Sequence, residues 1–64
     1  MENNLIKLFQ QMETEFILAC NDSEKFVEGN NSAGTRVRKH MQNIKSLAQR
    51  VRVEVQEQKN SVMV

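Results

Sequence analysis

The stretch GNNSAGTRVRKH, residues 29–40, lies near the middle of the 64-residue chain, between two segments rich in helix-forming residues. It begins with a glycine and two asparagines, which are typical of turns, and it ends in a cluster of cations. Gly29 is well placed to end a first helix as its C′ residue, and Asn31 or Ser32 can cap a second helix. The sequence therefore predicts a turn at residues 29–31 between two helices.

Apolar residues recur on both sides of this turn at alternating steps of three and four, the pattern of a heptad seam. The chain has no proline and only two glycines, so both segments favour helix. We predict an all-α fold, an antiparallel, coiled-coil-like two-helix hairpin, as a single domain over residues 1–64. Its helices are expected at about 4–28 and about 32–59, with Asn3 or Asn4 as the first cap and a frayed tail at 60–64. The predicted seams are Leu5, Phe9, Met12, Phe16, Ala19, Ser23 and Phe26, and Val37, Met41, Ile44, Ala48, Val51, Val55, Gln58 and Val62.

A single hairpin leaves many apolar residues uncovered, because one partner helix covers only a narrow stripe of another. The residues that lie off both predicted seams are Ile6, Leu8, Ile17, Leu18, Val27, Leu47 and Val53. Two hairpins packed into a four-helix bundle would cover several of them. We therefore expect an antiparallel homodimer, or a higher even oligomer, whose dimer and core residues include Leu5, Phe9, Met12, Phe16, Phe26, Met41, Ile44, Val51 and Val55.

The charges are divided unequally between the two halves of the chain, although the net charge is only +1. Residues 1–28 carry two cations and six acids, whereas residues 29–64 carry seven cations and two acids. A basic ridge follows the second seam at intervals of seven residues: Arg38, Lys45, Arg52 and Lys59. Acids of the first helix can pair with Arg52 and Lys59. Near the turn only Glu24 and Glu28 are available, so the cations there are expected to be in excess.

The turn and its cations have the composition of a phosphate site. Free N–H groups at a helix start attract anions, a small residue at Gly34 permits close approach, and arginine binds phosphate through two parallel bonds. No strand precedes the turn, and neither the P-loop nor the dinucleotide glycine pattern is present, so a mononucleotide site is excluded. The predicted DNA-phosphate binding residues are Asn30, Ser32, Gly34, Arg36, Arg38, Lys39 and Lys45.

The segment GNNSAGTRVRKHMQNIKSLAQRVR, residues 29–52, resembles the bacterial linker-histone-like proteins, the family of the chlamydial histone-like nucleoid protein and its short relatives. The positions that match are Gly29, Asn30, Ala33, Gly34, Arg36, Arg38 and Lys39. The resemblance covers roughly residues 24–59 and implies a nucleoid-associated protein that binds DNA without strong sequence specificity. The single cysteine of the sequence fits a reducing cytoplasm. Longer members carry a Lys- and Ala-rich basic tail that these 64 residues lack, and Asn31 stands where lysine is more usual.

Other functions find little support in the residues. Cys20 and His40 lack metal-ligand spacing, and we expect a half-buried thiol and a solvated surface histidine. No catalytic arrangement stands out, so we predict no enzyme activity, metal, cofactor or small-molecule substrate. No segment has the length and apolarity of a signal peptide or membrane span. The nucleic acid could be DNA or RNA, and the alternative function is a structural or adaptor helical-bundle module that binds another protein without nucleic acid.

Overall fold

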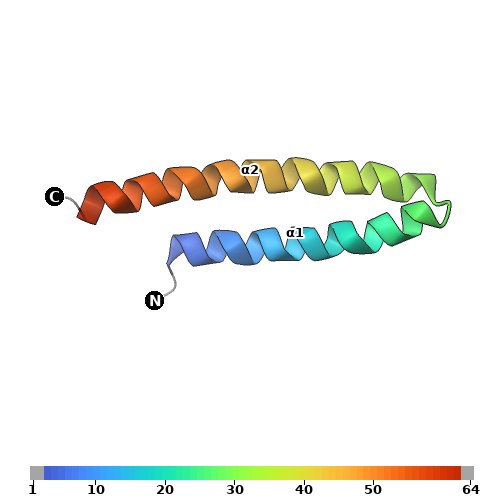
Figure 1. Cartoon of the computed structure of the whole chain (residues 1–64), viewed down its shortest axis with the longest axis horizontal. Helices are drawn as coiled ribbons and strands as arrows, with labels where there is room; N and C mark the ends of the chain where they lie inside the picture. The colour runs from blue at the N-terminus through green and yellow to red at the C-terminus, as the bar shows by residue number, and fades with distance from the viewer. Residues whose placement is uncertain (1–2, 63–64) are drawn as a thin grey trace.

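The computed structural model describes residues 3–62, which form two antiparallel helices that lie side by side (Figure 1). Helix α1 spans Asn4–Val27 and helix α2 spans Asn31–Val62. The chain reverses its direction over residues 28–30. The predicted all-α two-helix hairpin is therefore confirmed.

Each helix is preceded by an asparagine whose side chain caps it. The Asn3 Oδ1 atom accepts a hydrogen bond from the Leu5 N–H at 2.8 Å, as one of the two predicted caps would. The Asn30 Oδ1 atom accepts from the Ala33 N–H at 3.2 Å. The cap of α2 is thus one residue earlier than the sequence analysis predicted.

The turn ends α1 with a Schellman motif. The Gly29 N–H donates to the Phe26 carbonyl and the Asn30 N–H to the Lys25 carbonyl, each at 3.0 Å. Gly29 has φ +111°, a backbone conformation that residues with a side chain rarely adopt. Asn30 completes this motif and caps α2 at the same time, so the connection has the expected three residues but lies one residue earlier than predicted.

The open end of the hairpin is closed by a polar pair. The Gln58 Nε2 atom donates to Asn3 Oδ1 at 2.8 Å, which joins the last turns of α2 to the start of α1. Helix α2 is longer than α1, with 32 residues against 24, and it extends past the start of α1 (Figure 1). Residues 60–62 of the tail that was expected to fray are helical, and residues 63–64 lie outside the described residues.

The seam between the helices is rotated relative to the predicted one. Leu5, Met12, Ile44 and Val51 are half-buried and Ala19 is buried, as a seam requires. Phe9, Phe16, Met41 and Val55, however, are exposed by 39–60%, and Phe26 by 50%. As buried residues of the hairpin seam these five predictions are wrong; as dimer residues they stay a prediction. The apolar residues buried instead are Leu8, Ala33 and Leu47.

The rotation has a physical reason in the residues that share the seam. Apolar residues stand next to each other at Leu8–Phe9 and Leu47–Ala48, so apolar spacing alone allows two seams whose flanks differ by about 100° around each helix. The observed seam also brings Glu15 and Asp22 of α1 toward α2. Acids tolerate such a position only with hydrogen-bonding partners, and α2 supplies them.

Gly34 allows α2 to approach the aromatic ring of Phe26. A Cβ atom at residue 34 would lie 2.7 Å from Phe26 Cδ1, well inside van der Waals contact. The sequence analysis assigned the space beside this glycine to an anion. In the structure the Phe26 ring fills one side of it, so Gly34 serves the packing of the helices.

We expect the replacement Gly29→Val to lower the free energy of unfolding by about 1–2 kcal/mol, because valine is strained at positive φ. Open space surrounds the residue, so the loss arises from the backbone alone. Urea unfolding followed by circular dichroism, at one protein concentration, measures it. Gln49→Val, at an exposed position within α2, is the control and should cost only a few tenths of a kcal/mol. A gain in stability for Gly29→Val contradicts the turn.

Candidate nucleic-acid interface

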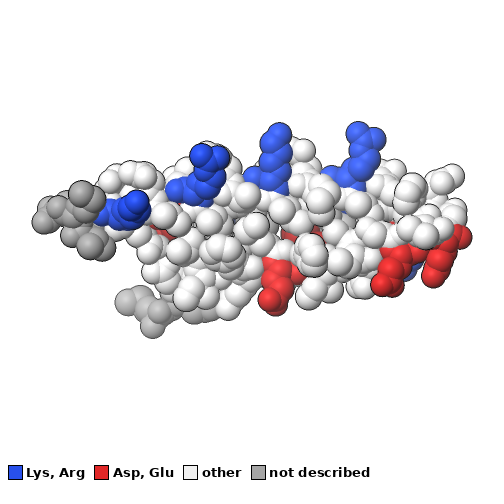
Figure 2. Space-filling model, viewed as in Figure 1, with Lys and Arg blue, Asp and Glu red and all other residues white. Residues whose placement is uncertain are grey.

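The basic ridge lies on the surface of α2 and consists of Arg38, Lys45, Arg52 and Lys59. All four residues are exposed, and Figure 2 shows cationic side chains that project at regular intervals along the α2 edge of the hairpin. Seven residues are two turns of helix, so successive cations lie about 10 Å apart along α2. The ridge is a linear array of positive charge about 30 Å long.

The ridge has no ion-pair partner among the residues that the structure describes. The ion pairs within 4.0 Å there join Arg36 with Asp22, and His40 with Glu15 and Asp22. The prediction left open whether Arg52 and Lys59 pair with acids of the first helix, and no such pair forms in residues 3–61. The reason is direction: Glu15 and Asp22 face the opposite flank of α2, where His40 lies.

Arg36 differs from the ridge and from its own prediction. It was expected to lack an acidic partner, but its Nε–H donates to Asp22 Oδ1 at 2.9 Å. The Asp22 side chain is only 11% exposed, whereas that of Arg36 is 45% exposed. Arg36 therefore neutralises a buried acid, and part of its guanidinium still faces solvent.

His40 lies between two acids of α1 rather than on the solvated surface that was predicted. Its Nδ1 atom is 2.8 Å from Glu15 Oε2 and its Nε2 atom is 3.1 Å from Asp22 Oδ2. A carboxylate only accepts hydrogen bonds, so both ring nitrogens must donate, which only the imidazolium can do. His40 is thus a second cation, besides Arg36, that pairs with acids of α1.

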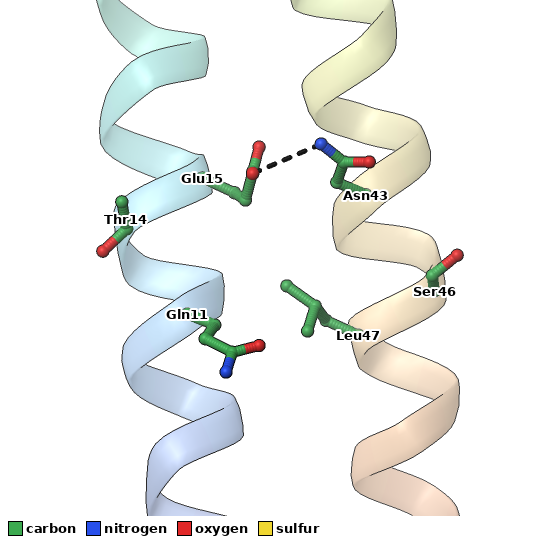
Figure 3. Close-up of a pocket in the computed structure, with 6 residues that line it drawn as sticks. All are labelled: Gln11, Thr14, Glu15, Asn43, Ser46 and Leu47. Atoms are coloured by element: carbon green, nitrogen blue, oxygen red, sulfur yellow. Dashed lines mark hydrogen bonds between the residues drawn. The ribbon is translucent and has the colours of Figure 1, made fainter.

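The same acids gather a further polar partner. Asn43 Nδ2 donates to Glu15 Oε1 at 3.2 Å, across the groove shown in Figure 3. This groove is open, with Gln11 and Leu47 among its lining residues. Glu15, Asp22, Arg36, His40 and Asn43 form one network, which we call the polar network. No buried side-chain nitrogen or oxygen of the described residues lacks a hydrogen bond.

The polar network shifts the titration of its members. The hydrogen bond from His40 is the main cause that lowers the pKa of Glu15 below its ordinary value. The hydrogen bond from Arg36 does the same for the pKa of Asp22. Chiefly through the hydrogen bond to Glu15, the pKa of His40 is raised above its ordinary value of 6.5, although partial burial acts in the opposite direction. Each of these shifts favours the charged form of its group, the imidazolium of His40 and the carboxylates of Glu15 and Asp22.

The remaining predicted phosphate-site residues divide into two kinds. Lys39 and Ser32 are exposed, as are the ridge residues Arg38 and Lys45. Asn30 is occupied as the cap of α2. Gly34 packs against Phe26. The structure thus brings the cations to the surface and uses the turn residues to shape the hairpin.

Sequence reasoning missed the polar network, although the sequence carried a signal for it. Glu15 and Asp22 stand seven residues apart, and Arg36, His40 and Asn43 are spaced by four and three. Two heptad-spaced acids facing such a polar series indicate a charged seam. The apolar series beside them masked this pattern.

The described part of the chain also bears on metal binding, on the cysteine thiol and on membrane insertion. Within it, no group of three or more histidines, cysteines or acids could hold a metal ion. Cys20 is exposed, not half-buried as predicted. Neither helix, over the residues described, is long and apolar enough to cross a bilayer.

The chain is a small helical protein with a cationic edge, and comparison with known proteins identifies its family. The family model of the histone H1-like protein Hc1 matches residues 6–61. The chain belongs to this family, which agrees with the resemblance seen around the turn. No curated protein and no solved structure shows significant similarity to the chain.

We expect the hairpin to be most stable between about pH 4.5 and pH 6.5. The raised pKa of His40 means that its contribution is complete below 6.5 and is lost as the pH rises through the raised value. The lowered pKa values of Glu15 and Asp22 mean that their contributions are lost only in acid. The charged groups around His40 are these two acids on α1, and Arg36 and Lys39 on α2.

The measurement is the free energy of urea unfolding from about pH 6 to about pH 9, at one protein concentration. The wild type should lose stability over this interval. The replacement His40→Gln should remove most of that loss while keeping a neutral donor beside the acids. If His40→Gln retains the full pH dependence, the imidazolium assignment is wrong.

Proposed function

We propose that this chain is a small histone-like, nucleoid-associated protein that binds duplex DNA through its phosphates without strong sequence specificity. The observation that carries the proposal is the exposed basic ridge, unpaired within the described residues, on a chain of the histone H1-like Hc1 family. A linear array of cations matches a polyanion that carries one charge per about 1.7 Å of duplex. The nucleoid is the place where such a protein would meet DNA.

The residues of the proposed DNA interface differ in how freely they can reach a phosphate. Arg38, Lys39 and Lys45 are exposed, and each can reach a phosphate without breaking an ion pair of the hairpin. Arg36 donates to Asp22 through Nε, and a guanidinium has further donors for a phosphate. Ser32 can add a hydroxyl. We assign Asn30 and Gly34 an indirect role, in shaping the turn that holds these residues.

The expected binding has little dependence on base sequence. Contacts to phosphate position a protein on the duplex but carry no sequence information. The ridge consists of lysines and arginines on one straight helix edge, and its flexible side chains can follow a backbone of any sequence. RNA carries the same phosphates, so a duplex RNA belongs in the test.

We expect the double replacement Arg38→Gln and Lys45→Gln to weaken duplex DNA binding and to reduce its salt dependence. The plot of log K against log salt should become shallower by up to about 1.8 units for each copy engaged, at about 0.9 per phosphate contact. Fluorescence anisotropy with two labelled DNA duplexes of different sequence, and one RNA duplex, measures both quantities.

The matched control removes the same charge from the other helix. Lys7→Gln with Lys25→Gln deletes two exposed cations of α1 and should change the slope much less. Circular dichroism checks that both variants keep the helicity of the wild type. If the wild type fails to bind any duplex at low salt, or if both double variants bind alike, the DNA proposal is wrong and the adaptor alternative is favoured.

A further inference from the structure

One side of the hairpin carries exposed apolar side chains that the fold leaves uncovered. Phe9 and Phe16 on α1 are 53% and 60% exposed, and Met41 and Val55 on α2 are 44% and 39% exposed. We call these four residues the apolar face. The part of an aromatic ring that stays in water contributes nothing to the stability of the hairpin, so a partner that covers this face would add to that stability.

The positions of these four residues along the two helices put them on the same side of the seam. The polar network joins Glu15 and Asp22 to His40 on one side of the seam. The next residue along each helix is rotated by about 100° around the helix axis. In an antiparallel pair this rotation carries the residues after Glu15, Asp22 and His40 to the same side of the seam, opposite to the polar network. These residues are Phe16, Ser23 and Met41. Phe9 and Val55 repeat this position by sevens. The two helices therefore present the apolar face on the side opposite to the polar network.

The edges of this side carry opposite charge. The ridge residues lie three or four positions from Met41 and Val55, so they border the apolar face along α2. Figure 2 shows a hairpin side whose middle carries little charge, with Lys and Arg along the α2 edge and with Asp and Glu at the middle and the turn end of the α1 edge. Met12 and Val37 are half-buried residues of the seam, and each is followed by an exposed charged residue. Glu13 on α1 therefore occupies the position that corresponds to Arg38 of the basic ridge on α2.

The hairpin also has little interior of its own. None of the side chains for which burial is described is both large and fully buried. The molecule measures 54 × 20 × 11 Å, only one helix thick, so its broad side offers a footprint on the order of 1,000 Å² against roughly 800 Å² per partner in a standard interface. A partner on the apolar face would supply the missing interior.

We propose that the apolar face packs against the apolar face of a second copy of this chain, with the two turns at the same end of a four-helix bundle. A two-fold axis along the bundle then lays α1 of each copy over α2 of the other. Phe9 and Phe16 meet the surface that carries Met41 and Val55. The acidic edge of each copy lies beside the basic ridge of the other.

The charges decide the orientation, because both face-to-face arrangements make every neighbouring helix pair antiparallel. With the turns at opposite ends, as the sequence analysis expected, α2 would lie on α2. In an antiparallel pair of identical helices, the residue numbers of facing positions add up to a constant. When the two hairpins overlap, Arg38 can therefore lie near Lys59 of the other copy, and Lys45 near its Arg52. Like charges in register repel. The arrangement with both turns together avoids this contact.

Sedimentation at micromolar concentration, without DNA, tests the assembly. The wild type should sediment as a dimer. Phe16→Glu should weaken the dimer by roughly 100-fold or more, because it places an unpaired carboxylate in the bundle. Leu18→Glu is the matched control: Leu18 is 43% exposed in the hairpin but lies about 200° further around α1, so the dimer should persist. A monomeric wild type, or equal losses in both variants, overturns the proposal.

A distance between two labels tests the orientation and does not depend on how Phe16→Glu folds. Cys20→Ser with Glu28→Cys leaves one exposed thiol beside the turn for a spin label. Turns at the same end should give a label separation below about 30 Å, the width of two packed hairpins. A separation close to the 54 Å length of the molecule overturns the orientation, and absence of any dipolar coupling overturns the dimer. DNA binding can fail while both results hold.

Discussion

The carboxylate of Asp22 fixes how far each helix is turned about its own axis. It is buried against α2 and accepts one hydrogen bond from Arg36 and one from His40. A buried acid without these partners would be costly, so any rotation of either helix that separates them is disfavoured. The hairpin is held in the one rotation that satisfies this group.

Most of the surface chemistry follows from that rotation. Turning Asp22 and Glu15 inward places Leu8 and Leu47 in the seam and leaves Phe9 and Phe16 outside it. The same rotation moves the basic ridge to the far edge of α2, beyond the reach of the acids in the network. The molecule thus has three distinct surfaces: a polar groove on one side, an apolar face on the other, and a cationic edge of α2 that borders the apolar face.

The sequence was sufficient to predict the parts of the fold that depend on neighbouring residues. The hairpin and its turn followed from Gly29, from the absence of proline and from the heptad spacing, because each acts within a few residues. The cap at Asn30 was missed by one position, since the Schellman motif lets one residue serve both helices. The seam could not be chosen from apolar spacing, because Leu8 and Phe9 satisfy that spacing equally well.

In the candidate site, too, the features set by one helix could be predicted, and those set by contacts between the two helices could not. Arg38, Lys39 and Lys45 are exposed, as predicted from their spacing along the second helix alone. The pairing of Arg36 and His40 depends on which residues of α1 face them, and that is a property of two helices together. Heptad-spaced acids opposite a histidine and an arginine carried this information, but only when both segments were compared.

The cross-helix hydrogen bonds described above form a series with a steadily growing separation along the chain. Asp22 meets Arg36 across 14 residues and His40 across 18, Glu15 meets His40 across 25 and Asn43 across 28, and Asn3 meets Gln58 across 55. Closing a loop costs more entropy as it lengthens, and each bond already formed shortens the loop left to the next. The entropy of loop closure therefore favours formation of the Asp22 contacts first and of the contact between Asn3 and Gln58 last. By the same reasoning, we expect the end of the hairpin at Asn3 to open on heating before the turn does.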